Sequence, residues 1–201
     1  MRRTTIALAL CLLAPSALAK GPAMVQPVTC TTPIGPAESA ASLKKRFGLA
    51  AKIEEVYLAE GQTQKAVVLF DSQPEKRMEV LYWDDAMRQV ATVRWDGARY
   101  SLAGLKVGDG IAAITKANGK PFTFFGFDWD YGGWTNMGKG KLDALPGGCS
   151  ASIRLDPPAN AENMPNALIG DRKVKSTDPL LARFPPRISS LSIDWPAPKG
   201  R

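Results

Sequence analysis

The stretch "RMEVLYW" at positions 77–83 has the alternation of a β-strand. Successive side chains of a strand point to opposite faces of a sheet, so Met78, Val80 and Tyr82 would share one face. Three similar runs lie on either side of it: "IEEVYL" (53–58), "KAVVLF" (65–70) and "VATVRW" (90–95). All are rich in β-branched and aromatic residues, and the turn signals "EGQ", "SQPE" and "DG" separate them. Runs this short and this close together predict an antiparallel meander.

Two short helices are expected beside this meander. Apolar residues recur at helical spacing over 38–47, and Gly48 marks the end of that helix. The stretch "GDGIAAITKANGKPF" at 108–122 predicts a second helix, capped by Asp109 and ended by Gly119. The two helical stretches match at an offset of 71 residues, either by accident or because the chain repeats one plan. The sequence therefore predicts an α+β fold of short helices packed on antiparallel sheet, with two tandem helix-plus-meander halves as one form of it.

This interpretation divides the chain into consecutive segments. They are a signal peptide at 1–19, an extended proline-rich arm at 20–34, a first half at 35–103, a second half at 104–195 and a tail at 196–201. The second half would contain the strands "FTFFGF" (122–127), "CSASIRL" (149–155) and "ISSLSIDW" (188–195). Between the last two, Pro, Asn and charged residues predict a long surface loop at 156–187, with one helical turn near Pro179–Ala182.

The first twenty residues have the layout of a secretory signal peptide. Two arginines precede a short apolar run that closes on Ala17-Leu18-Ala19, which predicts cleavage before Lys20. A lipid anchor at Cys11 is a weaker alternative because Leu10 precedes it where a small residue is needed, and a retained anchor is the other. We therefore expect a periplasmic or secreted protein with no transmembrane segment after cleavage.

Charge and cysteine content bear on the partners and the compartment. The formal net charge of +7 falls to +5 when the two arginines of the signal peptide are removed, which favours an anionic envelope component over nucleic acid as partner. Cleavage also leaves only two cysteines, Cys30 and Cys149. An even count in an oxidising compartment predicts a disulfide that closes a loop of about 120 residues; two free buried thiols are the alternative.

The run from Gly104 to Gly133 resembles a signature of exported bacterial proteins. That signature has a "GKPF", here at 119–122, then "GFxWDYGG", here at 126–133, and later "GGC", here at 147–149. The resemblance implies an exported protein of a family without an assigned activity. A looser similarity links "VGDGIAAITKANGKP" to the β-lactamase-inhibitor-protein-like fold of small outer-membrane assembly lipoproteins. That similarity implies a binding protein rather than a catalyst, although only one convincing helix per half is found and the lipidation motif is missing.

The stretch "GFDWDYGGWTN" at 126–136 concentrates the candidate chemistry. A calcium loop starting at Asp128 would place Asp130 at position 3, but Lys139 would occupy position 12, where a glutamate ligand is needed. No metal site is therefore predicted, although an irregular calcium site at the two aspartates stays open. On an extended chain the same two carboxylates would share one face, which is the basis of a glycosidase-like alternative in which Trp129, Tyr131 and Trp134 stack a sugar.

Other catalytic constellations are missing from the sequence. The chain has no histidine, which removes the usual general base and the commonest zinc ligand. Ser42 and Lys45 satisfy the Ser-x-x-Lys pattern, but its companion motifs are absent. No glycine-rich phosphate cradle follows a strand and opens a helix. The sequence therefore predicts no catalytic residues and no cofactor.

The leading hypothesis is an exported, non-catalytic envelope protein that binds a protein or a ligand. In "GFDWDYGGWTN", the alternation of Phe125, Phe127 and Trp129 predicts a buried aromatic face, while Tyr131 and Trp134 flank a glycine bend where they could meet a partner. The candidate binding residues are Asp128, Trp129, Asp130, Tyr131, Trp134, Lys139 and Lys141. The alternatives are a carbohydrate- or cell-wall-active hydrolase that uses Asp128 and Asp130, and a ligand carrier with an apolar pocket between helix and sheet.

Overall fold

A computed structural model describes residues 24–159 and 161–198. The predicted signal peptide lies outside these residues. Among the helices that the structure describes, none is long and apolar enough to cross a membrane.

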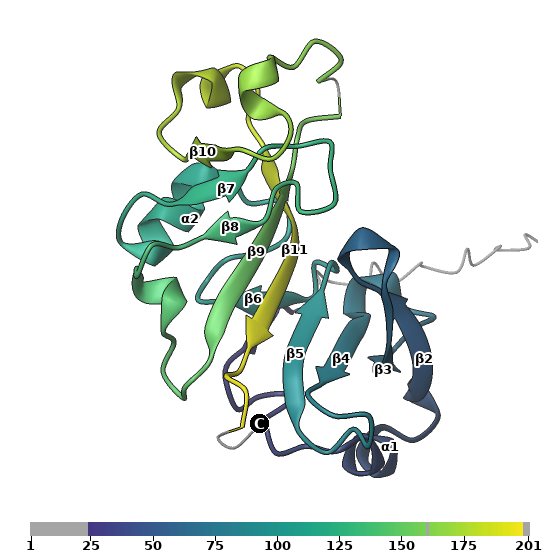
Figure 1. The fold of residues 1–201 in the computed structure, drawn as a ribbon. Helices are drawn as coiled ribbons and strands as arrows, with labels where there is room; N and C mark the ends of the chain where they lie inside the picture. Colours follow the sequence, from purple (N-terminus) through teal and green to yellow (C-terminus); the bar gives the residue numbers. More distant parts are fainter. Residues whose placement is uncertain (1–23, 160, 199–201) are drawn as a thin grey trace, which may run out of the picture.

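One six-stranded sheet dominates the fold, with strand order β2-β3-β4-β5-β11-β9 and antiparallel pairing throughout (Figure 1). Its strands are β2 Ala51–Tyr57, β3 Thr63–Leu69, β4 Met78–Tyr82, β5 Val90–Trp95, β9 Ser150–Asp156 and β11 Arg187–Asp194. The predicted meander is confirmed as β2 to β5, and the α+β class is confirmed with it. Strands β9 and β11 then extend the meander beyond β5, so a single sheet contains strands from both predicted halves.

Both predicted helices form, at α1 Ala40–Phe47 and α2 Ile111–Asn118. The side chain of Ser39 caps α1 by accepting from the backbone N–H of Ser42 at 3.1 Å. The predicted cap of α2 is wrong: Gly110 occupies the N-cap position, and the Asp109 carboxylate accepts from the backbone N–H of Lys106 at 2.9 Å. Asp109 therefore stabilises the turn before α2 rather than the helix itself.

The segment between β9 and β11 is not only a surface loop. It contains β10 Lys173–Lys175, which pairs with β7 Thr123–Phe125, and β7 pairs in turn with β8 Thr135–Asn136 to make a three-stranded sheet. Short 3-10 turns form at η5 Asn166–Leu168 and at η6 Pro179–Ala182, the second as predicted. The segment is fixed in place because Leu168, Val174 and Leu181 are buried in the core. Sequence composition alone gave no sign of these anchors.

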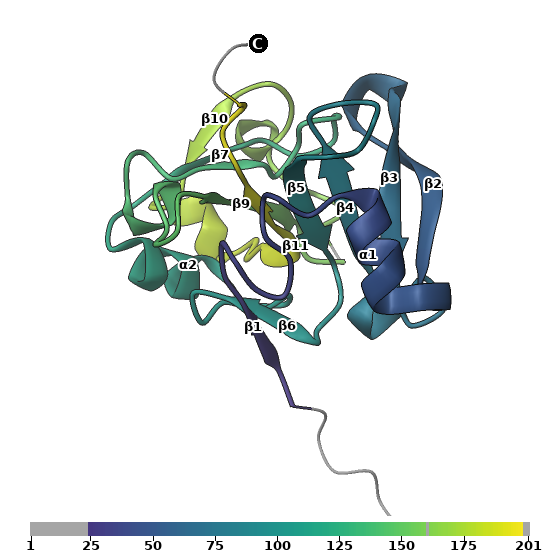
Figure 2. The same cartoon turned by 90° about the horizontal axis from the view of Figure 1, so that it is seen from below.

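The amino-terminal arm also joins the fold. Residues of the arm form β1 Gln26–Val28, which pairs in parallel with β6 Tyr100–Leu102 (Figure 2). The predicted disulfide is confirmed: Cys30 is bonded to Cys149, with their Cα atoms 5.5 Å apart. It ties the arm to the start of β9 and encloses a loop of 119 residues, worth about 4–5 kcal/mol in the chain-entropy account.

The two faces of the main sheet differ in composition. On one face, Val67, Val80, Val93 and Ile193 stand opposite one another across four strands, each with 0% of its surface exposed. This face packs in the main core with Leu43 of α1 and Ile114 of α2. The other face has only a small apolar cluster, made of Val56, Ala66, Val68 and Leu81, at the β2–β3 side. The rest of that outer face carries polar and charged side chains.

Candidate functional site

The stretch "GFDWDYGGWTN" forms a tight series of turns. Asp128 has a φ of 63°, and the backbone N–H of Gly132 donates to the carbonyl of Trp129 at 2.9 Å. The Trp129 indole N–H donates to the carbonyl of Gly126 at 2.8 Å. The expectation that Asp128 and Asp130 lie on an extended chain and share one face is therefore wrong. The glycosidase-like alternative loses the geometry on which it was based.

A close backbone approach fastens this loop to the edge of β9. The backbone N–H of Leu155 donates to the carbonyl of Gly133 at 3.0 Å, and Trp134 stands opposite Arg154 as an isolated antiparallel bridge. A Cβ at Gly133, whose φ is 79°, would lie 1.8 Å from the carbonyl oxygen of Leu155. Only glycine fits here, for two reasons: the backbone conformation and the space.

The aromatic side chains of this loop divide between the core and the surface. Phe124 and Phe127 are buried and pack together with their ring centroids 5.5 Å apart. The predicted buried face of Phe125, Phe127 and Trp129 is wrong because β7 ends at Phe125 and the chain then turns. Phe125 and Trp129 instead pack edge to face outside the core, with centroids 5.5 Å apart.

Tyr131 links this loop to the turn between β2 and β3. The negative charge of Glu60, in the 3-10 turn η2 Ala59–Gly61, raises the pKa of Tyr131 above its ordinary value. A smaller contribution in the same direction comes from Asp130. This electrostatic contact places the two segments close together, although 70 positions separate Glu60 from Asp130 in the chain.

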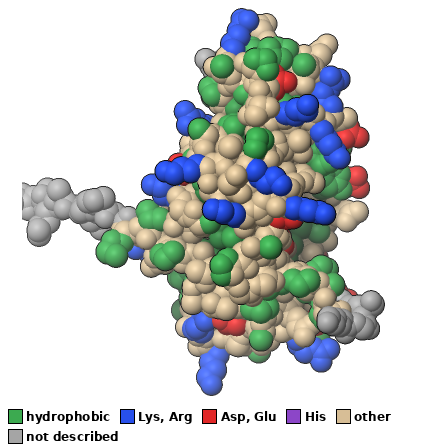
Figure 3. Space-filling model, turned by 90° about the vertical axis from the view of Figure 1, so that its left-hand side faces the viewer, with side chains coloured by type: hydrophobic (Ala, Val, Ile, Leu, Met, Phe, Trp, Pro, Cys, Tyr) green, Lys and Arg blue, Asp and Glu red, His purple; other side chains and the backbone are tan. Residues whose placement is uncertain are grey.

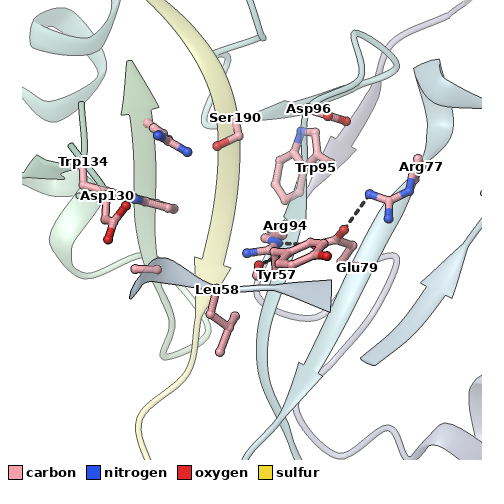
Figure 4. Close-up of a pocket in the computed structure, with 12 residues that line it drawn as sticks. Tyr57, Leu58, Arg77, Glu79, Arg94, Trp95, Asp96, Asp130, Trp134 and Ser190 are labelled. Atoms are coloured by element: carbon pink, nitrogen blue, oxygen red, sulfur yellow. Dashed lines mark hydrogen bonds and ion pairs between the residues drawn. The ribbon is translucent and has the colours of Figure 1, made fainter. Parts of the chain in front are cut away.

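A cavity of about 300 Å³ lies between these two segments, over the outer face of the main sheet. Figure 4 shows Asp130 and Trp134 on one side of β11, and Tyr57, Arg94 and Glu79 on the other. The residues that line it are Tyr57, Leu58, Ala59, Arg77, Glu79, Arg94, Trp95, Asp96, Asp130, Trp134, Arg154 and Ser190. The volume lies at the lower end of the range for small-molecule sites in proteins.

A network of ion pairs borders the cavity on the side of β4 and β5. Glu79, only 8% exposed, stands opposite Arg94 in the sheet and accepts from its Nε. Its other oxygen lies 2.6 Å from Nη1 of Arg77. Nη2 of Arg94 also donates to the carbonyl of Tyr57 at 2.7 Å, so the network reaches the end of β2. Both oxygens of the buried carboxylate are therefore engaged, which is the condition for keeping a charge in such a place.

The network continues to the surface through Asp71. Lys52 first, and then Arg77, hydrogen-bond to its carboxylate and lower the pKa of Asp71. Burial of the Arg77 guanidinium lowers its pKa, but the contacts with Glu79 and Asp71 outweigh burial, so the pKa of Arg77 lies above its ordinary value. Arg77 therefore remains charged and belongs to the architecture of this wall.

The predicted binding residues meet only in part. Asp130 and Trp134 line the cavity, whereas Asp128, Trp129 and Tyr131 do not. Lys139 and Lys141 do not line it either. The stem of Lys141 lies at the end of α2, where its Cε would be 3.3 Å from a Cβ added to Gly119. The basic rim expected beside Trp134 comes instead from Arg77, Arg94 and Arg154, while lysines and arginines elsewhere are spread over the side of the molecule in Figure 3.

The sequence contained one signal for the residues that were missed. Glu79 and Arg94 are charged residues within two mostly apolar strand runs, and neighbouring strands of a meander place such residues side by side. The contribution of Arg154 had no such signal, because its neighbours come from the non-local pairing of β9.

The arrangement of these groups suits binding by hydrogen bonds and stacking. Within the residues that the structure describes, no group of three or more His, Cys, Asp or Glu side chains could hold a metal ion. Comparisons of the chain with protein-family models, with curated proteins and with solved structures find no match.

Proposed function

We propose that the protein is an exported, non-catalytic component of the bacterial envelope that binds a ligand, or a protruding group of a partner protein, in the cavity beside Trp134. The observation that supports it most is the cavity itself. It is a concave site on the outer face of the main sheet, opposite the face that packs in the main core. Its walls combine the aromatic rings of Trp134 and Tyr57 with hydrogen-bond donors and acceptors. Such a combination is typical of ligand sites.

The positions of the carboxylates favour binding over catalysis. Glu79 is held by two arginines, so neither of its oxygens is available to a substrate. Asp130 and Asp96 lie at the exposed rim, and Asp128 does not line the cavity. A hydrolase of the glycosidase type needs two carboxyl groups that face one substrate bond from both sides. Of the carboxylates that line the cavity, Glu79 is engaged by the arginines and the two aspartates are exposed, which favours binding over hydrolysis of this type.

The disulfide supports the export part of the proposal. Disulfides persist in oxidising compartments such as the periplasm and the cell exterior, and are rare in the cytosol. The Cys30–Cys149 bond is at the junction of the arm with β9, where it belongs to the fold.

Native mass spectrometry can test the binding function. The purified protein is incubated with an envelope extract that contains lipids, peptidoglycan fragments and periplasmic proteins, and is then re-isolated by gel filtration. We expect an added mass on the native protein and its loss in Trp134→Ala, because the indole forms one wall of the cavity. The control is Leu49→Ala, since Leu49 is 98% exposed and does not line the cavity.

Two results would contradict this function. Either the native protein retains no added mass, or Trp134→Ala retains the same mass as the native protein. Turnover of a polysaccharide or peptidoglycan fragment that is lost in Asp128→Asn would instead support the hydrolase alternative.

A further inference from the structure

One guanidinium in the cavity has donors that the fold does not use. Arg154 donates from Nε to the carbonyl of Gly132 at 3.1 Å. Within residues 24–159 and 161–198, this is the only hydrogen bond of its side chain, and no carboxylate lies within ion-pair distance of it. The terminal nitrogens Nη1 and Nη2 are thus free to donate. Arg77 and Arg94 differ in that each has one terminal nitrogen engaged, Nη1 of Arg77 with Glu79 and Nη2 of Arg94 with the carbonyl of Tyr57.

The neighbours of Arg154 form a row suited to an oxyanion. Trp134 stands opposite Arg154 on one side, and Ser190 stands opposite it on the other. Directly opposed residues of antiparallel strands have their side chains on the same face, about 5 Å apart at Cβ. A register shift in β11 between Ile188 and Ser190 marks a bulge, a feature that re-aims side chains. The row therefore presents an aromatic ring, a guanidinium and a hydroxyl side by side.

The lining as a whole has three arginines and three carboxylates, so it is the charge at this row, and not the net charge of the cavity, that favours an anion. Glu79 pairs with Arg77 and Arg94, and Arg77 also pairs with Asp71, so the two arginines and the two carboxylates of this network balance in formal charge. Arg154 then adds one positive charge without a partner. The carboxylates of Asp96 and Asp130 also line the cavity, but both are exposed and neither reaches Arg154. A bound anion would accept hydrogen bonds from the terminal nitrogens of the half-buried Arg154, whose Nε–H is already held in place by Gly132.

We propose that this row, Trp134, Arg154 and Ser190, is an oxyanion subsite that binds a carboxylate or a phosphate group of the ligand. Arg154 anchors the anion through its two terminal nitrogens, Ser190 adds a hydroxyl donor, and Trp134 packs against the planar or apolar part that carries the anion. The planar fork of arginine matches both kinds of oxyanion, whereas a lysine would offer only a point charge. This inference rests on the proposed binding function and specifies the chemistry of its ligand.

NMR titration of the native chain tests the subsite directly. The probes are benzoate and phenyl phosphate, with benzamide and phenol as their neutral counterparts, all at physiological ionic strength. The signals to follow are the Arg154 Nε–H and the Trp134 indole N–H, assigned by their loss in Arg154→Lys and Trp134→Phe. We expect saturable shifts of both signals with at least one anion, and at least tenfold weaker binding of its neutral counterpart, because a charge-assisted pair is lost.

The variants separate recognition from a structural role. Arg154→Lys keeps the charge but loses the bidentate geometry. It should therefore lower the affinity for the anion about tenfold and leave the affinity for the neutral probe unchanged. The control Arg88→Lys changes an arginine that is 77% exposed in its side chain and does not line the cavity, so it should leave both titrations unchanged. A role limited to holding the loop through Gly132 predicts instead that Arg154→Lys changes the affinities for the anion and for its neutral counterpart by the same factor.

The outcomes distinguish this inference from the function on which it rests. Equal affinity for benzoate and benzamide, and for phenyl phosphate and phenol, would overturn the oxyanion subsite. If the mass found with the envelope extract is still lost in Trp134→Ala, the cavity binds a ligand, but one of different chemistry. A preference for benzoate over phenyl phosphate assigns the subsite to carboxylates, and the reverse assigns it to phosphates.

Discussion

The two faces of the six-stranded sheet use the same strands for different purposes. On the core face, a row of fully buried aliphatic side chains runs from Val67 to Ile193. On the outer face, the adjacent row is Glu79, Arg94 and Ser192, with Arg154 and Ser190 next to it. The core face can be explained by burial of apolar surface alone. On the outer face each polar group needs its own hydrogen-bond partner. The terminal nitrogens of Arg154 have no such partner among the described residues.

The largest expected effect comes from breaking the core face. Ile153 is fully buried, so Ile153→Ala should lower the free energy of unfolding by about 2–5 kcal/mol through lost burial and a residual cavity. Its neighbour Ser152 points to the outer face and makes no hydrogen bond through its side chain among the described residues, so Ser152→Ala should change stability by less than about 0.5 kcal/mol. Urea denaturation of both variants measures the contrast. Equal losses would mean that the faces are not distinct.

The next effect concerns the loop that closes the cavity. Gly133→Ala should cost about 3 kcal/mol, because its methyl group would enter the backbone of Leu155 and its φ is positive. Gly138 also has a positive φ of 58°, but a Cβ there would meet nothing within 4 Å. Gly138→Ala should therefore cost only about 1 kcal/mol. Thermal or chemical denaturation of the two variants separates the effect of the close contact with Leu155 from that of backbone strain. A similar loss of stability in both variants would show that the contact with Leu155 adds nothing.

Removing the buried carboxylate tests whether the ion-pair wall is structural. Glu79→Gln should destabilise by about 2 kcal/mol, since two partly exposed guanidinium groups lose their partner. Glu55→Gln is the matched control at an exposed position of β2 and should be close to neutral. Denaturant unfolding would measure both. A neutral Glu79→Gln would show that the wall contributes no stability.

The smallest effect is a dependence on pH. The folded pKa of Asp71 is lowered by Lys52 and Arg77, so its contribution to stability is present above the ordinary value of 3.8 and disappears as the pH falls through the lower folded value. Asp71→Asn should therefore show a shallower loss of stability between pH 5 and pH 3, a range of about two units around that value, than the native protein. Asp156→Asn, on the exposed end of β9, is the control. If the stability of the native protein and of Asp71→Asn changes with pH in the same way, the ion pairs of Asp71 contribute nothing to stability.

Local sequence patterns were sufficient to predict the meander and the two helices. Alternation defines a strand within seven residues, and Gly48 and Gly119 end the helices where they were expected to. The pairing of β11 with β5 and of β10 with β7 could not be predicted, because it depends on contacts between segments that are far apart in the sequence. The same reason explains why the segment at 156–187 was interpreted as a surface loop.

The site was only partly predictable for the same physical reason. Asp130 and Trp134 were identified because aromatic residues, carboxylates and glycines cluster in one short stretch. The turn geometry of that stretch depends on Gly133 meeting the backbone of Leu155, which no local pattern contains. The remaining lining residues come from the end of β2 and the turn after it, from the ends of β4 and β5, and from β9 and β11, so the cavity exists only in the folded sheet.

Hydrogen exchange with and without the envelope extract is the sharpest test of binding in the cavity beside Trp134, because it locates binding on the native chain without any substitution. We expect slower exchange in peptides that cover 57–62 and 126–136, the two segments that enclose the cavity, and no change in α1. Protection confined to α1 or to β10, with those two segments unchanged, would place the binding surface elsewhere on the molecule and refute binding in this cavity.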